Sequence, residues 1–276
     1  MKDGDKLHRR FDRLGRLVGD EGVKSLMSSH VMVVGLGGVG SWAAEALVRS
    51  GIGKITLVDF DDICVTNMNR QLQALSSVVG QQKALVLAER FHQINPSIVI
   101  ESLVKFYEAK TADEIFATRP DFVVDAIDNI TAKCHLINYC HKNKIPLVCS
   151  TGSGGKLDPT LIQVKDLAET QIDPLAKALR RILREQYGFP LEGPYGISAV
   201  YSTEPAAEPK ELHYDGGKGF QCICPNKASS PHGCENRSVI LGTAAFVTAS
   251  FGMVCASVAV RTLLASAPIS YSRISR

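Results

Sequence analysis

Four glycines near the start of the chain have the spacing of a phosphate-binding turn. Gly35, Gly37 and Gly40 form the pattern G-x-G-x-x-G, Gly38 lies within it, and an apolar run at 31–34 precedes it. A helical segment follows, and this strand, turn and helix context makes the pattern informative. In such a turn the backbone approaches phosphate groups closely at the start of a helix. The glycines therefore predict a nucleotide site.

Two cations and an asparagine after the next apolar run indicate which reaction the nucleotide undergoes. Asn67 and Arg70 lie in one short segment, and Lys83 follows further along. When a carboxylate attacks ATP, negative charge develops on the α-phosphate while pyrophosphate leaves, and cations must stabilise both. Hydride transfer by a nicotinamide-dependent oxidoreductase needs no such cations. Each residue alone is typical of a solvated surface, but together they favour ATP cleavage with Arg70 and Lys83 as catalytic residues.

Carboxylates at two predicted strand ends complete the nucleotide site. Asp59 ends the second apolar run, at the spacing of an acid that accepts hydrogen bonds from ribose hydroxyls, and we assign Asp61 to the same site. Asp128 and Asn129 follow the run at 122–125, where the carboxyl ends of parallel strands line a ligand crevice. A hard oxygen ligand suits Mg²⁺, so Asp128 is the candidate metal ligand and a fourth catalytic residue. The alternative for both Asp59 and Asp128 is a local capping role.

The elements that must position these residues alternate between strand and helix. Strands are predicted at 31–34, 54–59, 98–104, 122–125 and 146–150, and helices at 41–49, 81–93 and 131–142. The first βαβ unit closes within about thirty residues, which requires a parallel pair of strands. The pattern predicts an α/β fold with a doubly wound, mostly parallel, Rossmann-like sheet. Strands at 161–164 and 197–202 extend this sheet, and a long surface loop is predicted at 205–231.

Length and composition favour one domain with a large core. The chain has 276 residues, 45% of them hydrophobic, and a formal net charge of +3, which does not indicate a strongly cationic nucleic-acid binder. We expect one adenylation domain at 1–265, with a nucleotide-binding half at about 1–150 and a substrate-binding and dimerisation half at about 151–265. Residues 266–276 form a tail.

Eight cysteines and a charged N-terminal segment help to predict the cellular compartment of the protein. Residues 1–16 contain no apolar segment that could export the chain, so the thiols are expected to be reduced and the protein cytoplasmic. Cys222, Cys224 and Cys234 could build a zinc site, but their spacing lacks the paired C-x-x-C motifs of related zinc sites, and free thiols are the default. The uncharged stretch at 240–260 is long enough to span a bilayer, yet its many small residues favour a buried or interface helix and no stable membrane insertion.

These motifs resemble those of the E1-like superfamily, which includes ubiquitin activators and the adenylating enzymes of thiamin and molybdopterin synthesis. The resemblance runs from about Arg9 to the final apolar helix. It implies that ATP is the cofactor, that Asp59 binds the ribose and that Asn67 and Arg70 bind phosphates. It also implies that Lys83 binds the α- and β-phosphates and that Asp128 holds Mg²⁺.

An N-terminal motif in the superfamily reaches into the partner subunit as an arginine finger. The segment Arg10-Phe11-Asp12-Arg13 resembles it, which implies a homodimer with Arg13 acting catalytically in trans. The alternative for Arg13 is an ordinary charge on a helix surface.

Within the superfamily, several longer stretches look like the tRNA-modifying dehydratases that cyclise threonylcarbamoyladenosine. They lie at 35–44, 65–71, 143–146, 154–160, 164–177 and 202–204. The resemblance implies adenylation of the threonyl carboxylate at position 37 of tRNA, followed by ring closure with loss of AMP. Three alternatives stay open: an adenylyltransferase for a ubiquitin-like sulfur carrier, an oxidoreductase and a silent nucleotide-binding scaffold. Bacterial dehydratases carry a cysteine where this chain has Ala199, so an essential thiol at that position is ruled out.

A predicted helix at 174–186 presents positive charge on one side. Its cations, spaced at i, i+3, i+4 and i+7, are Lys177, Arg180, Arg181 and Arg184. Such a face could follow the phosphates of tRNA, although a solvated face of an ordinary amphipathic helix is the alternative. A sulfur-transfer partner is also compatible with the superfamily resemblance.

Overall fold

The computed structural model describes residues 9–213 and 241–265. Outside these residues lie the candidate zinc ligands Cys222, Cys224 and Cys234, the tail at 266–276 and most of the predicted loop at 205–231.

One seven-stranded sheet has the order β3-β2-β1-β4-β5-β7-β6. The strands are β1 (His30–Val34), β2 (Lys54–Val58), β3 (Val99–Leu103), β4 (Phe122–Asp125), β5 (Leu147–Ser150), β6 (Ile162–Asp166) and β7 (Ser198–Ser202). Neighbouring strands are parallel except β6, which runs antiparallel to β7, so the predicted fold class and sheet extension are confirmed.

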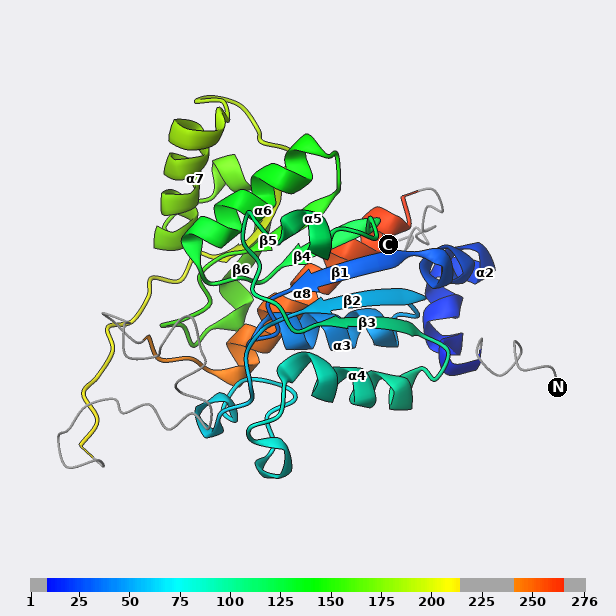
Figure 1. Ribbon diagram of the computed structural model, residues 1–276. Coiled ribbons are helices and arrows are strands. Elements are labelled where there is room, and N and C mark those ends of the chain that lie inside the picture. Colours follow the sequence, from blue (N-terminus) through cyan, green and yellow to red (C-terminus); the bar gives the residue numbers. More distant parts are fainter. Residues whose placement is uncertain (1–8, 214–240, 266–276) are drawn as a thin grey trace, which may run out of the picture.

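Helices cover both faces of the sheet (Figure 1). On one face lie α3 (Gly40–Arg49), α4 (Lys83–Ile94) and α8 (Ala245–Leu263), and on the other lie α5 (Ala112–Ile115), α6 (Ile130–Lys142) and α7 (Pro174–Tyr187). Successive side chains of a strand point to opposite faces of the sheet. Val31 and Val33 therefore pack into the core on the face with α3, α4 and α8, whereas Met32 and Val34 pack into the core on the face with α5, α6 and α7. Short 3-10 turns are η1 (Val65–Asn67), η2 (Ser76–Val78), η3 (Pro159–Leu161) and η4 (Leu167–Glu169).

The register of the central strands brings the predicted site residues to one edge. The last residue of β1, Val34, is paired with Val58 of β2 on one side and with Asp125 of β4 on the other. The segments that follow these three strands therefore leave the sheet side by side. They carry the glycine turn (residues 35–40), the carboxylates after β2 and the Asp128 loop (residues 126–129).

No bounds were predicted for helix α2 (Asp12–Ser28), although a helix surface was the alternative setting for Arg13. Gly19 interrupts it with a left-handed φ of 73°, and glycines weaken helical periodicity, so the pattern at 12–28 does not indicate a continuous amphipathic helix. Phe11, just before α2, is buried against Gly51. The helix lies beside the end of the sheet where β1 begins (Figure 1).

The long apolar helix α8 packs closely against the start of α3. A Cβ atom at Gly252 would lie 2.5 Å from the carbonyl oxygen of Val39, so only glycine allows this approach. Among the residues that the structure describes, α8 is the one helix long and apolar enough to cross a membrane. Its packing against α3 and the sheet explains the small residues, while Phe246 (55%) and Met253 (44%) stay exposed.

Candidate nucleotide site

The glycine turn is built for close backbone contact. Gly35 has a left-handed φ of 90°, and a Cβ atom there would lie 2.7 Å from the carbonyl oxygen of Ala126. A Cβ at Gly40 would lie 1.8 Å from the carbonyl oxygen of Gly35. At Gly37, by contrast, the nearest atom would be 4.0 Å away. The turn is therefore closed toward the protein and open on the side from which a phosphate would approach.

The Asp59 carboxylate stabilises the glycine turn by accepting backbone hydrogen bonds. Its Oδ2 accepts a hydrogen bond from the backbone N–H of Leu36 at 2.6 Å, and its Oδ1 accepts one from the backbone N–H of Asp61 at 2.8 Å. Burial raises the pKa of Asp59, while the neighbouring Lys83 ammonium opposes this rise. Asp59 is 9% exposed, so most of its surface is buried in the protein.

Lys83, the first residue of α4, lies at the centre of the acidic side chains. Its Nζ donates to Oδ2 of Asp61 at 2.6 Å and lies 4.0 Å from Oδ1 of Asp59. Burial alone would lower the pKa of Lys83, but Asp59, Asp61 and Asp128 together raise it above its ordinary value. A cation that is only 4% exposed therefore keeps its charge, and the Asp128 carboxylate is close enough to contribute.

Arg70 lies over the glycine turn. Its Nη1 donates to the carbonyl oxygen of Thr66 at 2.9 Å and to Oδ1 of Asn69 at 3.0 Å. A Cβ placed on Gly38 would be 3.3 Å from Cγ of Arg70, so the two residues are in contact range. Nε1 of Trp42 donates to the carbonyl oxygen of Arg70 at 3.0 Å, which anchors the segment.

The two asparagines of the predicted site shape the backbone. Oδ1 of Asn67 accepts the backbone N–H of Cys64 at 3.0 Å, and Asn67 is buried. Oδ1 of Asn129 accepts the backbone N–H of Ala132 at 3.0 Å and caps α6. Asp128 is exposed, and of this neighbouring pair it is Asn129 whose side chain caps α6.

A second set of loops lies beside the Asp128 loop, after β5 and β7. The Glu204 carboxylate accepts backbone N–H groups from Leu157 and Asp158 at 2.9 Å each. Gly155 donates its N–H to the carbonyl oxygen of Gly242 at 2.7 Å, and it accepts the N–H of Ala207 at 2.7 Å. These bonds tie the stretches at 154–160 and 202–204 to the segment before α8. In the sequence these stretches resemble the dehydratases without indicating a role, and the structure shows that they hold neighbouring loops together.

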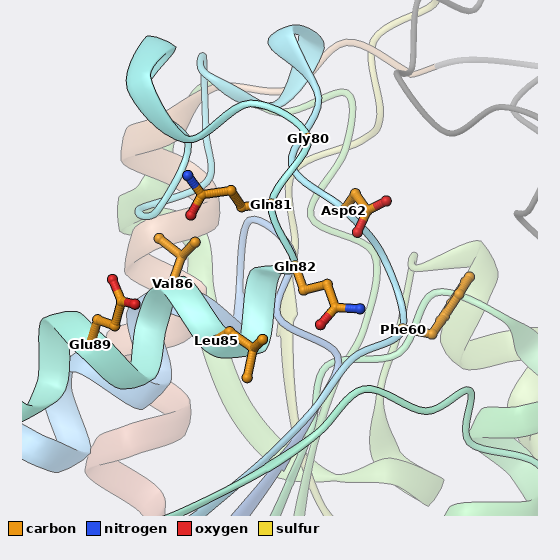
Figure 2. A pocket seen from close by; sticks show the side chains of 8 residues that line it. All are labelled: Phe60, Asp62, Gly80, Gln81, Gln82, Leu85, Val86 and Glu89. Carbon is orange, nitrogen blue, oxygen red and sulfur yellow. The ribbon is translucent and has the colours of Figure 1, made fainter.

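Sequence reasoning also missed Gln73, which lies under the glycine turn. Gln73 is 2% exposed, and its Nε2 donates to the carbonyl oxygen of Leu36 at 2.8 Å. An isolated glutamine in the sequence carries no signal for such a contact. A pocket of about 600 Å³ lies further out, between the segment after β2 and the start of α4, lined among others by Phe60, Asp62 and Gln82 (Figure 2). The predicted nucleotide residues do not line it.

The structure does not bring Arg13 or the α7 cations to this site within one chain. Arg13 is exposed on α2, and α2 lies beside the end of the sheet where β1 begins, opposite the end that leads into the glycine turn (Figure 1). On α7, Arg180 donates to the Thr170 hydroxyl, and Nε of Arg184 donates to the Tyr195 hydroxyl at 2.7 Å. The predicted cationic face is thus divided, because these two arginines tie α7 to neighbouring loops while Lys177 and Arg181 are exposed.

The five cysteines that the structure describes are unsuited to nucleophilic chemistry. Cys64, Cys134, Cys140, Cys149 and Cys255 are all buried. Burial raises the pKa of Cys134 to about 11 and that of Cys255 to about 12. Ala199 is fully buried on β7. Over residues 9–213 and 241–265, no three His, Cys, Asp or Glu side chains gather as a metal cluster.

Known proteins match the chain along nearly its whole length. The tRNA threonylcarbamoyladenosine dehydratase of Escherichia coli (strain K12) is 43% identical over 265 residues, which are 95% of this chain and 96% of that protein. The protein of the same name from Bacillus subtilis (strain 168) is 47% identical over 199 residues, 72% of this chain and 76% of that protein. The crystal structure of the E. coli tRNA N6-threonylcarbamoyladenosine dehydratase in complex with ATP has a TM-score of 0.81 and 42% identity, and the match covers 95% of this chain and 97% of that one. A model of the ThiF family matches residues 11–274, so the chain belongs to the ThiF family.

Proposed function

We propose that this chain is an ATP-dependent tRNA threonylcarbamoyladenosine dehydratase. The threonyl carboxylate at position 37 attacks the α-phosphorus of ATP, the bond to the β-phosphate breaks, and pyrophosphate leaves. A nucleophile within the same modification then attacks the acyl carbon, and AMP leaves as the ring closes. The observation that supports this most is the buried, charged Lys83 beside the glycine turn, in a chain whose full-length relatives carry this name.

In this proposal the glycine turn and its cations hold the triphosphate. Backbone N–H groups of the turn contact phosphates, and Arg70 and Lys83 stabilise the charge that develops on the α-phosphate and on pyrophosphate. Lys83 is paired with Asp61 in the structure, so it must exchange a carboxylate for a phosphate when ATP binds. Asp59 accepts the ribose hydroxyls, and Asp61 lies beside it.

Asn67 and Asn129 belong to the same proposed nucleotide-binding set. Both side chains cap backbone turns at the crevice, so their contribution to binding is to fix the segments that carry Arg70 and Asp128.

The residues present fit a Mg²⁺ ion that is held mainly by the phosphates. Such ions use one or two protein carboxylates and otherwise bind phosphate and water. Asp128 is one exposed carboxylate whose charge reaches Lys83, which matches that donor set. When bound, Mg²⁺ would neutralise phosphate charge, and Asp128 is the residue that we propose to hold it.

Ring closure requires no enzyme nucleophile. Both reacting groups belong to one modified nucleoside, and holding them together makes the second step intramolecular. The raised pKa values of the buried thiols are consistent with this route.

We further propose a cytoplasmic homodimer that acts on tRNA. Residues 1–265 would act as one adenylation domain, since strands from both halves share a sheet. Arg13 would act in the partner's site, and Lys177 and Arg181 would contact tRNA phosphates, with Arg180 and Arg184 holding α7 in place. A sulfur-transfer partner remains a separate hypothesis, and the packing of α8 supports a helix that does not insert stably into a membrane.

The deciding experiment mixes purified protein and ATP with threonylcarbamoylated tRNA, with the same tRNA lacking the modification, or with a carrier protein that ends in Gly-Gly. AMP and pyrophosphate should form only with the modified tRNA, and the nucleoside should lose one water. AMP formed with the carrier and not with the modified tRNA would make the chain a carrier adenylyltransferase instead.

A further inference from the structure

A fully buried ion pair lies directly beneath the Asp128 loop. Nζ of Lys133, from α6, donates to Oδ1 of Asp125 at 2.8 Å, to the carbonyl oxygen of Asp125 at 3.3 Å and to the carbonyl oxygen of Ile127 at 3.0 Å. Both charged side chains are 0% exposed. All three N–H groups of the ammonium thus point at oxygens of one three-residue stretch, which begins at the last residue of β4.

A requirement for stability alone does not explain why this ion pair is buried. Removing two charges from water costs several kcal/mol per ion, and apolar residues of similar volume often serve as well or better. The cost is not fully offset here, because Oδ2 of Asp125 is buried without a nitrogen or oxygen donor, and the Cys149 thiol beside the carboxylate is only a weak donor. Burial raises the pKa of Asp125 even though Lys133 opposes this rise, which reflects the same penalty.

The Lys133 ammonium donates hydrogen bonds to two backbone carbonyls and one carboxylate, which an apolar side chain could not do. Oδ1 of Asp125 also accepts the backbone N–H of Ile127 at 3.1 Å, so the chain folds tightly around Nζ. Asp128 follows at once, and the Asn129 cap fixes the chain on its other side. The backbone of Asp128 is therefore held between two anchors, one at Asp125 and Ile127 and one at Asn129.

We propose that Lys133 is a positioning residue of the nucleotide site, which holds the Asp128 loop in its working geometry from inside the protein. The proposal rests on the function proposed above, because it assumes that Asp128 acts in AMP formation. Lys133 itself touches no reactant. A misplacement of a reacting group by about 1 Å can cost about 10²-fold in rate, so such an anchor matters for turnover.

The test is a double-mutant cycle between the ion pair and Asp128. The pair variant, Asp125→Asn with Lys133→Met, removes both charges, keeps the volume and keeps an acceptor for the Ile127 N–H. We expect its kcat for AMP formation to fall by about 10²-fold. In an Asp128→Ala background, the same pair of substitutions should cause little further loss, because the ion pair acts through Asp128. Losses that simply multiply would overturn the proposal.

Amide hydrogen exchange gives a readout that does not depend on turnover. Residues 127–132 should exchange faster in the pair variant, whereas β1 should keep its protection. Unchanged exchange at 127–132 would also overturn the proposal. If the parent protein forms no AMP with modified tRNA, the proposed function has failed, and hydrogen exchange still decides whether Lys133 holds the loop.

Two further variants separate positioning from general stability. Thr56→Val removes a buried hydroxyl in β2 that lies 2.8 Å from Nε2 of His30, and we expect lower thermal stability with parental turnover. A loss of turnover as large as that of the pair variant would mean that any buried defect slows the enzyme. Where the pair variant fails to fold, Asp125→Asn with Lys133→Gln removes both charges, keeps a neutral donor at position 133 and enters the same cycle with Asp128→Ala.

Discussion

At the scale of single residues, the decisive feature is a buried lysine that stays charged. The pKa of Lys83 is raised, so its contribution to stability is fully present below the unfolded value of 10.5 and is lost only as the pH rises through the folded value. Around neutral pH the ammonium therefore does not titrate. Any pH dependence of ATP binding in that range must come from another group.

Replacement of this charge should abolish most of the activity. In Lys83→Met, Asp59 and Asp61 lose their shared cation and the phosphates lose a donor, so AMP formation should fall by roughly 10²–10³-fold. The rate of AMP release measures the loss of activity, and calorimetry measures the affinity for ATP. Lys54→Met is the matched control, because Lys54 pairs with Glu101 at 3.3 Å at the start of β2. Parental rates in Lys83→Met would show that ATP cleavage does not use this residue.

At the scale of elements, α7 shows how one helix face can serve two purposes. Asp173 caps its first turn, Leu179 and Leu183 face the core, and two of its four cations bond to neighbouring loops. The exposed pair, Lys177 and Arg181, is what remains for a polyanion.

Reversal of the exposed pair should weaken tRNA binding. In Lys177→Glu with Arg181→Glu, the affinity for tRNA should fall and its salt dependence should become shallower, by about one unit of slope per lost phosphate contact. Binding isotherms at several salt concentrations measure this, and ATP affinity should not change. Arg16→Glu with Lys24→Glu on α2 makes the same change of charge elsewhere and should bind tRNA normally. Equal affinity in both double variants would remove α7 from the tRNA surface.

At the scale of the whole molecule, the nucleotide site of one chain does not include Arg13, the predicted arginine finger. The glycine turn, Lys83 and Asp128 meet at the carboxyl ends of the strands, whereas α2 lies beside the opposite end of the sheet, where β1 begins (Figure 1). A role for Arg13 in the reaction therefore requires a second copy of the chain.

Mixed dimers test this requirement. Arg13→Ala and Lys83→Ala should each be inactive alone, because every site then lacks one of the two residues. An equal mixture that exchanges subunits should recover about a quarter of the parental AMP formation, since half of the dimers contain one complete site. Size-exclusion chromatography with light scattering checks the dimer. A mixture as inactive as its components would mean that both residues act in the same chain.

The sequence by itself determined the parts of this protein that depend on local pattern. Apolar runs placed β1, β2, β4 and β5 nearly to the residue, because buried parallel strands are continuously apolar. The glycine turn was equally readable, since its spacing and its strand and helix context are local. The order of the motifs was enough to identify the family, which the match over residues 11–274 confirms.

The tertiary structure decided which side chains meet, and the physical reason is that such contacts depend on strand order and register. Lys133 on a predicted helix is indistinguishable from a surface charge until β4 is placed beneath it. Arg180 and Arg184 followed the same periodicity as Lys177 and Arg181, yet only folding showed that the first two have partners within the chain. The sequence motifs placed Asp59, Lys83 and Asp128 in one site, but the pairing of Lys83 with Asp61 and its closeness to Asp59 depend on how α4 packs beside β2, which no local pattern encodes.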